Sequence, residues 1–450
     1  ARRRVRPPAE VPAPVTADPH PVASNVRTLF PGYFAMVMAT GIIAIGAALL
    51  DLPWIADVLY AIAAATYAVL AVLLLWRAVR YASVLAADIT SHAKGFAFLT
   101  TVAASNVLGS ASGVIHGWWG AAWVLWWIGL ALWAFFVYAT LFAVVLKGPK
   151  PGLEHGINGT WFLLTVATES VVVLGALLLA RHPDDLLAFG LIAAFALGLV
   201  LYLIVMTMVF LRWTFTELQP TEADPPAWIA AGAVAITVLA GSNLLGAAPA
   251  SERIARLAPF IEGVVVLAWA TATFWFPLMV AIGIWRHVIN RVPLRYHPSY
   301  WALVFPLGMY GVATFRMRAA VQLDALAWLP KVTFAVALAA WFAAAGRPPE
   351  LRRAMTINWI GPVDQVPAKC PDDPEVGVPN KQFRLFDQLV APAATCSACS
   401  CGPSEGVCGG VPETLELRAI LEPYLLRRSA PRLTPAELDG LARLLAAYDA

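Results

Sequence analysis

The chain is short of charge. Only 13% of its 450 residues are Asp, Glu, Lys or Arg, whereas a soluble domain carries about 25%. Hydrophobic residues make up 60%, 18 residues are Trp, and the mean hydropathy is +0.70. These values exclude an ordinary soluble domain and indicate a polytopic membrane protein in a lipid bilayer. The net charge of +3 gives no reason to expect a nucleic-acid partner.

Cysteine and histidine are missing where a membrane redox site would need them. All five Cys residues follow residue 369, and the seven His residues fall in expected loops or at helix ends. This distribution argues against a haem-binding bundle or a His proton relay. The apolar runs also lack a nucleophile–base pair and a metal-ligand set. We therefore expect no enzyme, and no cofactor in the membrane part.

Ten apolar runs follow an Arg- and Pro-rich arm. Each run is close to the roughly 20 residues that a membrane-spanning helix needs. We expect a disordered arm over 1–28, an all-α integral membrane domain over 29–346, and a tail over 347–450. The runs cover residues 31–50, 54–76, 96–114, 119–146, 160–180, 186–211, 227–247, 259–285, 299–320 and 328–345.

Lys and Arg are distributed unevenly between the loops. If the N-terminus is cytoplasmic, seventeen of them lie on the inner side. The outer side then has only six, which are Arg181, Arg253, Arg256, Arg316, Arg318 and Lys331. Positive residues favour the cytoplasmic side of a membrane, so we expect both termini in the cytoplasm and the protein in the inner or plasma membrane.

The odd-numbered runs contain small and polar residues that several even-numbered runs lack. This alternation suggests five helical hairpins, with the odd members in an inner ring around a central pore and the even members outside. Small residues also serve ordinary close packing of helices, so the pattern alone leaves that alternative open.

The ninth run reads SYWALVFPLGMYGVATFRM from Ser299 to Met317. Pro306 lies in its middle and removes a backbone donor, so the freed carbonyl needs another partner or water. Phe305 directly precedes this weak point. A ring beside a kink near mid-membrane is well placed to block a pore, although it could equally pack against neighbouring helices.

These residues resemble a known family. Trp301, Ala302 and Phe305 are similar to the ninth helix of the tellurite-resistance/C4-dicarboxylate transporters, which include the plant guard-cell slow anion channels. Phe30-Pro31-Gly32-Tyr33-Phe34 and Met38-Ala39-Thr40-Gly41 resemble the start of the first helix of that family. The resemblance covers roughly residues 30–346.

The resemblance implies ten helices arranged as five hairpins, with Phe305 as the plug of a central pore. It also implies a homotrimer and small anionic substrates: C4-dicarboxylate, sulfite, chloride, nitrate or an oxyanion such as tellurite.

A pore for anions needs weak, uncharged sites from which an ion can also leave. Hydroxyls, amides and the dipoles of broken helices supply such sites. Our candidates for the pore lining are therefore small, polar or kink residues of the odd runs: Gly41, Asn106, Thr165, Glu169, Ser242, Asn243, Pro306 and Gly308.

Three charged residues of the membrane part have competing interpretations. Arg316 and Arg318 could concentrate anions at the outer mouth, or they could simply extend to water at the interface. Glu169 lies mid-membrane, where a carboxylate costs on the order of 3 kcal/mol. It is either protonated and packed, or paired, or involved in coupling proton movement to transport of a carboxylate or sulfite.

The tail has a different composition. Cys396, Cys399, Cys401 and Cys408 lie close together with several Gly residues, and clustered thiols in a reducing cytoplasm favour metal over disulfide. Their spacing fits no standard motif, so zinc, an Fe–S cluster, a redox sensor and plain thiols all stay open. Two short helices are expected after them, over 413–427 and from Thr434 onward.

The sequence thus predicts transport of small anions through a pore gated by Phe305. Two alternatives are a proton-coupled carrier that uses Glu169, and a membrane metal or redox sensor that acts through the tail.

Overall fold

The computed structural model describes residues 26–220, 225–293 and 298–345. Every regular element in these ranges is a helix. Residues 1–25 of the arm, the Cys cluster and the two expected tail helices lie outside the described residues.

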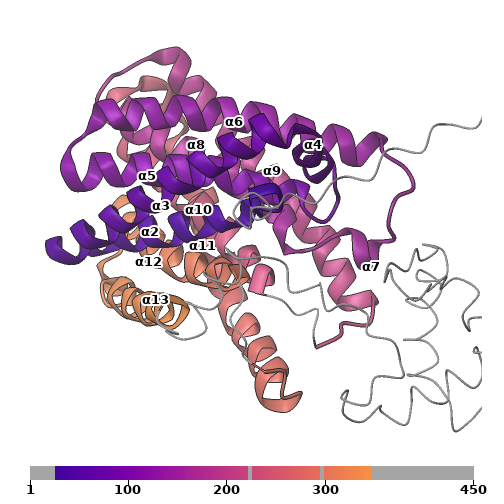
Figure 1. The fold of residues 1–450 in the computed structure, drawn as a ribbon. Helices are drawn as coiled ribbons and strands as arrows, with labels where there is room; N and C mark the ends of the chain where they lie inside the picture. The colour runs from indigo at the N-terminus through magenta and orange to yellow at the C-terminus, as the bar shows by residue number, and fades with distance from the viewer. Residues whose placement is uncertain (1–25, 221–224, 294–297, 346–450) are drawn as a thin grey trace, which may run out of the picture. The chain divides into compact units, whose positions relative to one another are not determined.

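Five inner helices form the centre of the bundle. Each contacts the next in the order given below, and the last contacts the first, so they make a closed ring. Figure 1 labels these helices in the bundle. The inner helices are α2 (Phe34–Leu49), α5 (Leu99–His116), α8 (Leu163–Leu179), α10 (Ile229–Gly246) and α12 (Trp301–Ala320).

Five outer helices cover this ring, and each packs on the inner helix that precedes it in the chain. They are mostly exposed: 11–28% of the residues in their most apolar stretch are buried, against 72–94% for α2, α5, α8 and α10. The separation into inner and outer helices predicted from the sequence is therefore observed. The outer helices are α3 (Pro53–Arg80), α6 (Trp119–Leu146), α9 (Asp185–Phe215), α11 (Glu252–Ile284) and α13 (Leu329–Ala345).

Nine helices in the described part of the chain are long and apolar enough to cross a membrane. The ninth of the ten predicted spans, residues 299–320, forms α12, which is not one of these nine. Pro306, Arg316 and Arg318 make it less apolar than its neighbours, yet it packs against α2, α10 and α13. An apolar sequence is thus not required of a helix that is buried among other helices.

Each inner helix begins with a 3-10 turn. The turns are η1 (Pro31–Tyr33), η2 (Gly95–Phe98), η3 (Gly159–Phe162), η4 (Pro225–Trp228) and η7 (Pro298–Tyr300). Proline occurs early in three of them, where its fixed φ and missing N–H cost nothing. Shorter elements complete the described fold: the helices α4 (Ala82–Ile89) and α7 (Leu153–Gly156), the 3-10 turns η5 (Ala248–Ala250) and η8 (Asp324–Leu326), and the π-helical turn η6 (Trp285–Ile289).

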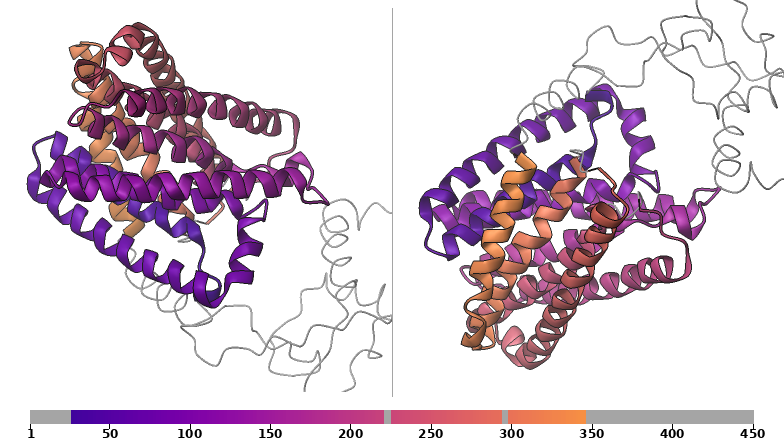
Figure 2. Two further views of the ribbon diagram at one scale, coloured as in Figure 1. Left: turned by 90° about the horizontal axis from the view of Figure 1, so that it is seen from above. Right: turned by 90° about the horizontal axis from the view of Figure 1, so that it is seen from below.

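The ring closes where the first inner helix meets the last hairpin. The two views of Figure 2 show α12 and α13, in orange, next to the indigo start of the chain. Nε1 of Trp341 on α13 donates a hydrogen bond to Oγ1 of Thr40 on α2 over 2.9 Å. This bond was not predictable from the sequence, because the two residues are 301 positions apart.

Candidate functional site

A cavity of about 410 Å³ lies at the end of the ring where all five inner helices begin. Every inner helix contributes residues to it, so the cavity is centred on the ring. We call it the vestibule. Its lining comprises Phe30, Gly32, Ala35, Met38, Ala97, Thr100, Thr160, Leu163, Pro225, Pro226, Ile229, Arg286, Pro293, Pro298, Ser299, Tyr300, Ala302 and Phe305.

The vestibule is electropositive by construction. An α-helix carries roughly half a positive charge at its N-terminus, and here five N-termini open toward one cavity. Arg286 adds a full positive charge, and the lining residues include no Asp or Glu. The positive ends of helices are suited to bind anions. The vestibule therefore attracts anions without holding them on a fixed cluster of cations.

Phe305 lies at the boundary between the vestibule and the interior of the ring. Its side chain lines the cavity but is only 2% exposed. Ala302 also lines the vestibule. Its carbonyl is the one that Pro306 deprives of the usual helical donor, so water in the vestibule can take the place of that donor. The proline that predicts a kink thus directly follows Phe305 at the floor of the cavity.

The contacts of α12 show which of its faces looks into the ring. Pro306 packs against Gly232 of α10, and Gly308 packs against Ile42 and Ile43 of α2. Gly311 approaches α13, and Thr314 accepts a hydrogen bond from Trp269 of α11. The remaining face, between α10 and α2, is the one that carries Phe305. The aromatic ring is therefore directed toward the axis of the five helices.

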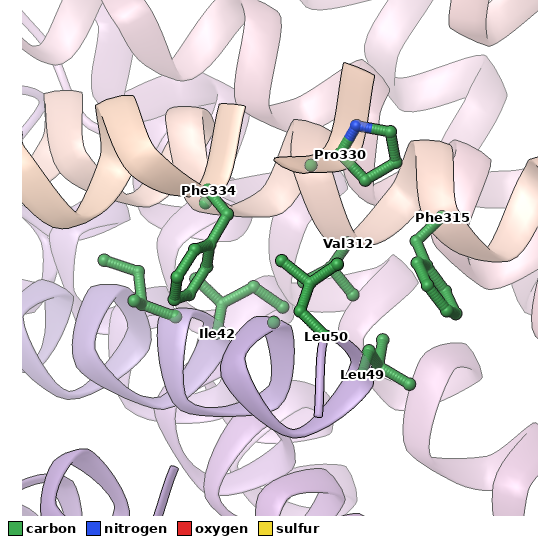
Figure 3. Close-up of a pocket in the computed structure, with 11 residues that line it drawn as sticks. Ile42, Leu49, Leu50, Val312, Phe315, Pro330 and Phe334 are labelled. Carbon is green, nitrogen blue, oxygen red and sulfur yellow. The ribbon is translucent and has the colours of Figure 1, made fainter. Parts of the chain in front are cut away.

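Two of the glycines predicted to line a pore serve helix packing. A Cβ on Gly41 would lie 2.8 Å from Cγ1 of Val107 on α5. Gly308 borders an apolar groove of only about 10 Å³ between α2, α12 and α13, into which Ile42, Val312 and Phe334 project (Figure 3). Neither glycine lines the vestibule. A contribution to a conduction path deeper in the ring stays a prediction.

Three of the predicted polar residues form hydrogen bonds inside the bundle. Two of them join one inner helix to another, and the third bonds within its own helix. Asn106 of α5 donates to Oγ of Ser170 on α8 over 3.1 Å, and Asn243 of α10 donates to the carbonyl of Val173 on α8 over 3.1 Å. Ser242 donates to a carbonyl of its own helix. These bonds satisfy polar groups that would be costly to bury alone.

Some buried polar atoms keep unused capacity. Oδ1 of Asn106 and Oγ1 of Thr165 have no hydrogen-bond partner among the described residues. The Thr165 hydroxyl can donate a hydrogen bond to water or to an anion, whereas Oδ1 of Asn106 can only accept one, for example from water. Their role as pore-lining residues stays a prediction.

Glu169 lies at the junction of α8, α9 and α10. Its side chain is fully buried, and a Cβ on Gly198 of α9 would lie 2.4 Å from its Oε1. Thr237 of α10 is its polar neighbour, but that hydroxyl donates to the carbonyl of Ala233. Neither carboxyl oxygen has a hydrogen-bond partner in the described part of the chain. A buried carboxyl with no counter-charge favours the protonated form.

A buried arginine anchors the rim of the vestibule. Arg77 of α3 is fully buried and donates to the carbonyls of Arg27 and Leu29 over 3.0 and 2.9 Å, and to Oδ2 of Asp88 over 2.5 Å. These bonds fix the segment that leads into Phe30. Sequence reasoning counted Arg77 only as a positive charge in a loop, because its partners lie up to 50 positions away.

Asp88 completes this anchor. Burial raises the pKa of its carboxyl, but hydrogen bonds from Arg77 and Lys94 outweigh that effect, so its pKa is below the ordinary value. Lys94 lies 3.1 Å from the second oxygen. The carboxylate is thus ionised at neutral pH and bridges α3, α4 and the start of η2.

Arg286 is a further vestibule residue that the sequence did not single out. It lies in the π-helical turn η6 after the long helix α11. In the sequence, the basic residues around Arg286 indicated only on which side of the membrane this loop lies. The sequence did contain a signal. Pro293 and Pro298 follow α11, just as Pro225 and Pro226 precede α10, and all four line the vestibule.

Comparisons with known proteins agree with this architecture. A family model described as voltage-dependent anion channel matches residues 28–347. An uncharacterized membrane protein of Mycobacterium tuberculosis is 41% identical over 141 residues, which cover 31% of this chain and 71% of that protein.

Two relatives from an archaeon align over a longer stretch. Two uncharacterized transporters of Methanocaldococcus jannaschii are each 26% identical to this chain. The first alignment covers 63% of this chain and 82% of the transporter, and the second covers 65% and 85%. The family model spans well over half of the chain, and its range agrees with the resemblance seen in the motifs around Phe30 and Phe305. The chain is therefore a membrane transporter rather than an enzyme, and it belongs to the voltage-dependent anion channel family.

Proposed function

We propose that the ring of inner helices conducts small anions and that Phe305 is the plug of this path. The observation that supports it most is the convergence of five helix N-termini on a vestibule whose floor is the Phe305 ring. An anion drawn into the vestibule meets a single aromatic side chain before the interior of the ring. Movement of that side chain, or of the kink at Pro306, opens the path.

The proposal extends to orientation and assembly. The vestibule faces the cytoplasm, because the loops on its side carry most of the Lys and Arg residues and such residues favour the cytoplasmic side. The protein is a homotrimer with one path in each protomer, as the family resemblance implies. Its substrates are small anions such as C4-dicarboxylate, sulfite, chloride, nitrate or tellurite-type oxyanions, in a cell membrane.

The test is anion flux into liposomes that contain the purified full-length chain. We compare the unmodified protein with Phe305→Ala for chloride, nitrate, sulfite and malate. Removing the ring should raise flux markedly, and the ranking of the anions then identifies the substrate class. Phe195→Ala is the matched control, since Phe195 is as buried as Phe305 but belongs to the outer helix α9. An equal rise in both variants would reflect a loosened core and would contradict the plug.

A second candidate function is proton-coupled transport that uses Glu169. The lack of any partner for its carboxyl oxygens favours this alternative, because such a group is free to bind and release a proton. Glu169→Gln should then remove the dependence of flux on a proton gradient while it leaves the shape of the side chain intact. Flux that keeps its dependence on the gradient in this variant would eliminate the coupled mechanism. The sensor alternative depends on Cys residues outside the described part of the chain.

A further inference from the structure

Two arginines near the end of α12 have different surroundings. Nη1 of Arg318 lies 2.6 Å from Oδ1 of Asp324, and its guanidinium also lies over the ring of Phe315. Arg316 forms no hydrogen bond or ion pair with any residue that the structure describes. It is nonetheless only partly exposed. An arginine in such a place needs an anionic partner or water.

The register of α12 places Arg316 in line with Phe305. Eleven residues separate them, which at about 100° per residue is three turns plus roughly 20°, and a rise of about 16 Å. Arg316 therefore projects from the same face as Phe305, the one that looks between α10 and α2 into the ring. Arg318 lies on another face of the helix. Of the two arginines, only Arg316 is directed toward the proposed conduction path.

A second positive charge comes from α8. Arg181 follows the last turn of that helix, and its charge acts on Arg316. The guanidinium of Arg181 lies over the ring of Trp119, 3.3 Å from its centroid. This stacking holds the cation at the end of the ring that is opposite to the vestibule. Two like charges thus act on each other, one on the exposed Arg181 and one on the partly buried Arg316.

Three of the acidic residues at this end of the bundle are engaged elsewhere. Asp185 is paired with Arg253 over 2.6 Å, and Asp324 with Arg318. Asp184 accepts a hydrogen bond from the backbone N–H of Leu187. No described ion pair therefore relieves the repulsion between Arg181 and Arg316. An external anion between them would do so, with charge-assisted hydrogen bonds on both sides.

We infer that Arg316 and Arg181 form a binding site for a small oxyanion at the end of the conduction path opposite the vestibule. This inference rests on the proposed function, in which anions pass along the ring. The planar guanidinium fork matches carboxylate and nitrate better than the spherical chloride ion. The site thus concentrates planar oxyanions at the second mouth of the path.

Binding is measured apart from transport. The full-length chain in detergent micelles is heated with increasing nitrate, at constant ionic strength maintained by a bulky organic sulfonate. A ligand that binds the folded state raises Tm in a saturable way. For Arg316→Gln we expect the half-saturating nitrate concentration to rise about tenfold, as loss of a bidentate charged contact predicts. Arg318→Gln is the matched control and should behave like the unmodified chain.

A conservative variant separates charge from shape. Arg316→Lys keeps the positive charge but loses the fork, so we expect it to respond to chloride as the unmodified chain does and to lose its preference for nitrate. Size-exclusion profiles and unshifted Tm values without nitrate identify variants that still fold. An unchanged half-saturating concentration in Arg316→Gln, or no saturable shift in the unmodified chain, would overturn the inference.

The outcome is independent of the plug. If Phe305→Ala raises flux while Arg316→Gln keeps its nitrate response, the path stands and the second site is wrong. If Arg316→Gln loses the response while Phe305→Ala leaves flux unchanged, the site is supported as a binding site and the proposed plug is wrong.

Discussion

Gly232 of α10 faces Pro306 of α12 so closely that a Cβ at position 232 would lie 2.8 Å from the Cγ atom of the proline. The two helices thus meet at the level of Phe305, one residue before the proline. The position of the proposed plug depends on this contact, because nothing larger than hydrogen fits between Gly232 and Pro306. The site proposed to control conduction can therefore be perturbed without touching Phe305 itself.

Gly232→Val should move α12 away from α10 and raise basal anion flux. A branched side chain in a closely packed contact typically costs 1–3 kcal/mol, so Tm should also fall. The control is Gly263→Val on α11, where a Cβ meets nothing within 4 Å. Liposome flux is the measurement, and equal flux in both glycine variants would show that the helix contact does not position the plug.

Gly198 and Glu169 should be coupled in stability. Gly198→Ala places a methyl group 2.4 Å from Oε1 of Glu169, which we expect to destabilise the chain by about 1–3 kcal/mol. In a Glu169→Ala background the same change should cost much less, since the space is then free. Denaturant unfolding of the four combinations gives the interaction energy, which should be about 1–2 kcal/mol. Additive effects would show that the two helices separate readily at this point.

Arg77→Met should destabilise the membrane domain by about 3 kcal/mol. The change leaves the carbonyls of Arg27 and Leu29 without their side-chain donor and the Asp88 carboxylate with Lys94 alone. Removal of one partner of a buried pair is costly. Arg80→Met, one turn further along α3 and exposed, is the control and should stay close to the unmodified chain in thermal unfolding. A similar Tm for both variants would contradict the anchor.

Asp88 should make the unfolding free energy of the chain depend on pH in the acidic range. Its pKa is lowered in the folded state, so its contribution is present above the unfolded pKa of about 3.9 and is lost as pH falls through the folded value. The difference in unfolding free energy between the unmodified chain and Asp88→Asn should be constant from about pH 8 to pH 5 and shrink at lower pH. A difference that does not change down to pH 3 would mean that the carboxylate is not stabilised by Arg77 and Lys94.

Much of the fold was predictable because membrane helices are encoded locally. The predicted span 119–146 is identical to α6, and 160–180 differs from η3 and α8 by one residue at each end. Burial of the odd spans followed from their small and polar residues, which suit contact with several helices. The contacts of Arg77 with Arg27, of Thr40 with Trp341 and of Gly232 with Pro306 were not predictable, since each joins residues 50 or more positions apart.

The candidate site was predictable in part. Phe305 and Pro306 stood out because a proline in a long apolar run is unusual. The structure places Phe305 at the floor of the vestibule, and Pro306 next to it packs against Gly232. The two arginines that follow them looked equivalent in sequence. Only the helical register and the position of Asp324 separate Arg316 from Arg318. The helical register follows from the spacing in the sequence, but the pairing of Asp324 with Arg318 does not.

The bond between Trp341 and Thr40 has a consequence for synthesis of the chain. The first inner helix enters the bilayer some 300 residues before its last neighbours emerge from the ribosome. Until then, the face of α2 that will contact α12 and α13 must be covered by lipid or by the insertion machinery. Closure is therefore the last step of assembly, and contacts so distant in sequence form slowly. A nascent chain interrupted before α12 would remain an open arc of helices, without a vestibule floor and without a plug.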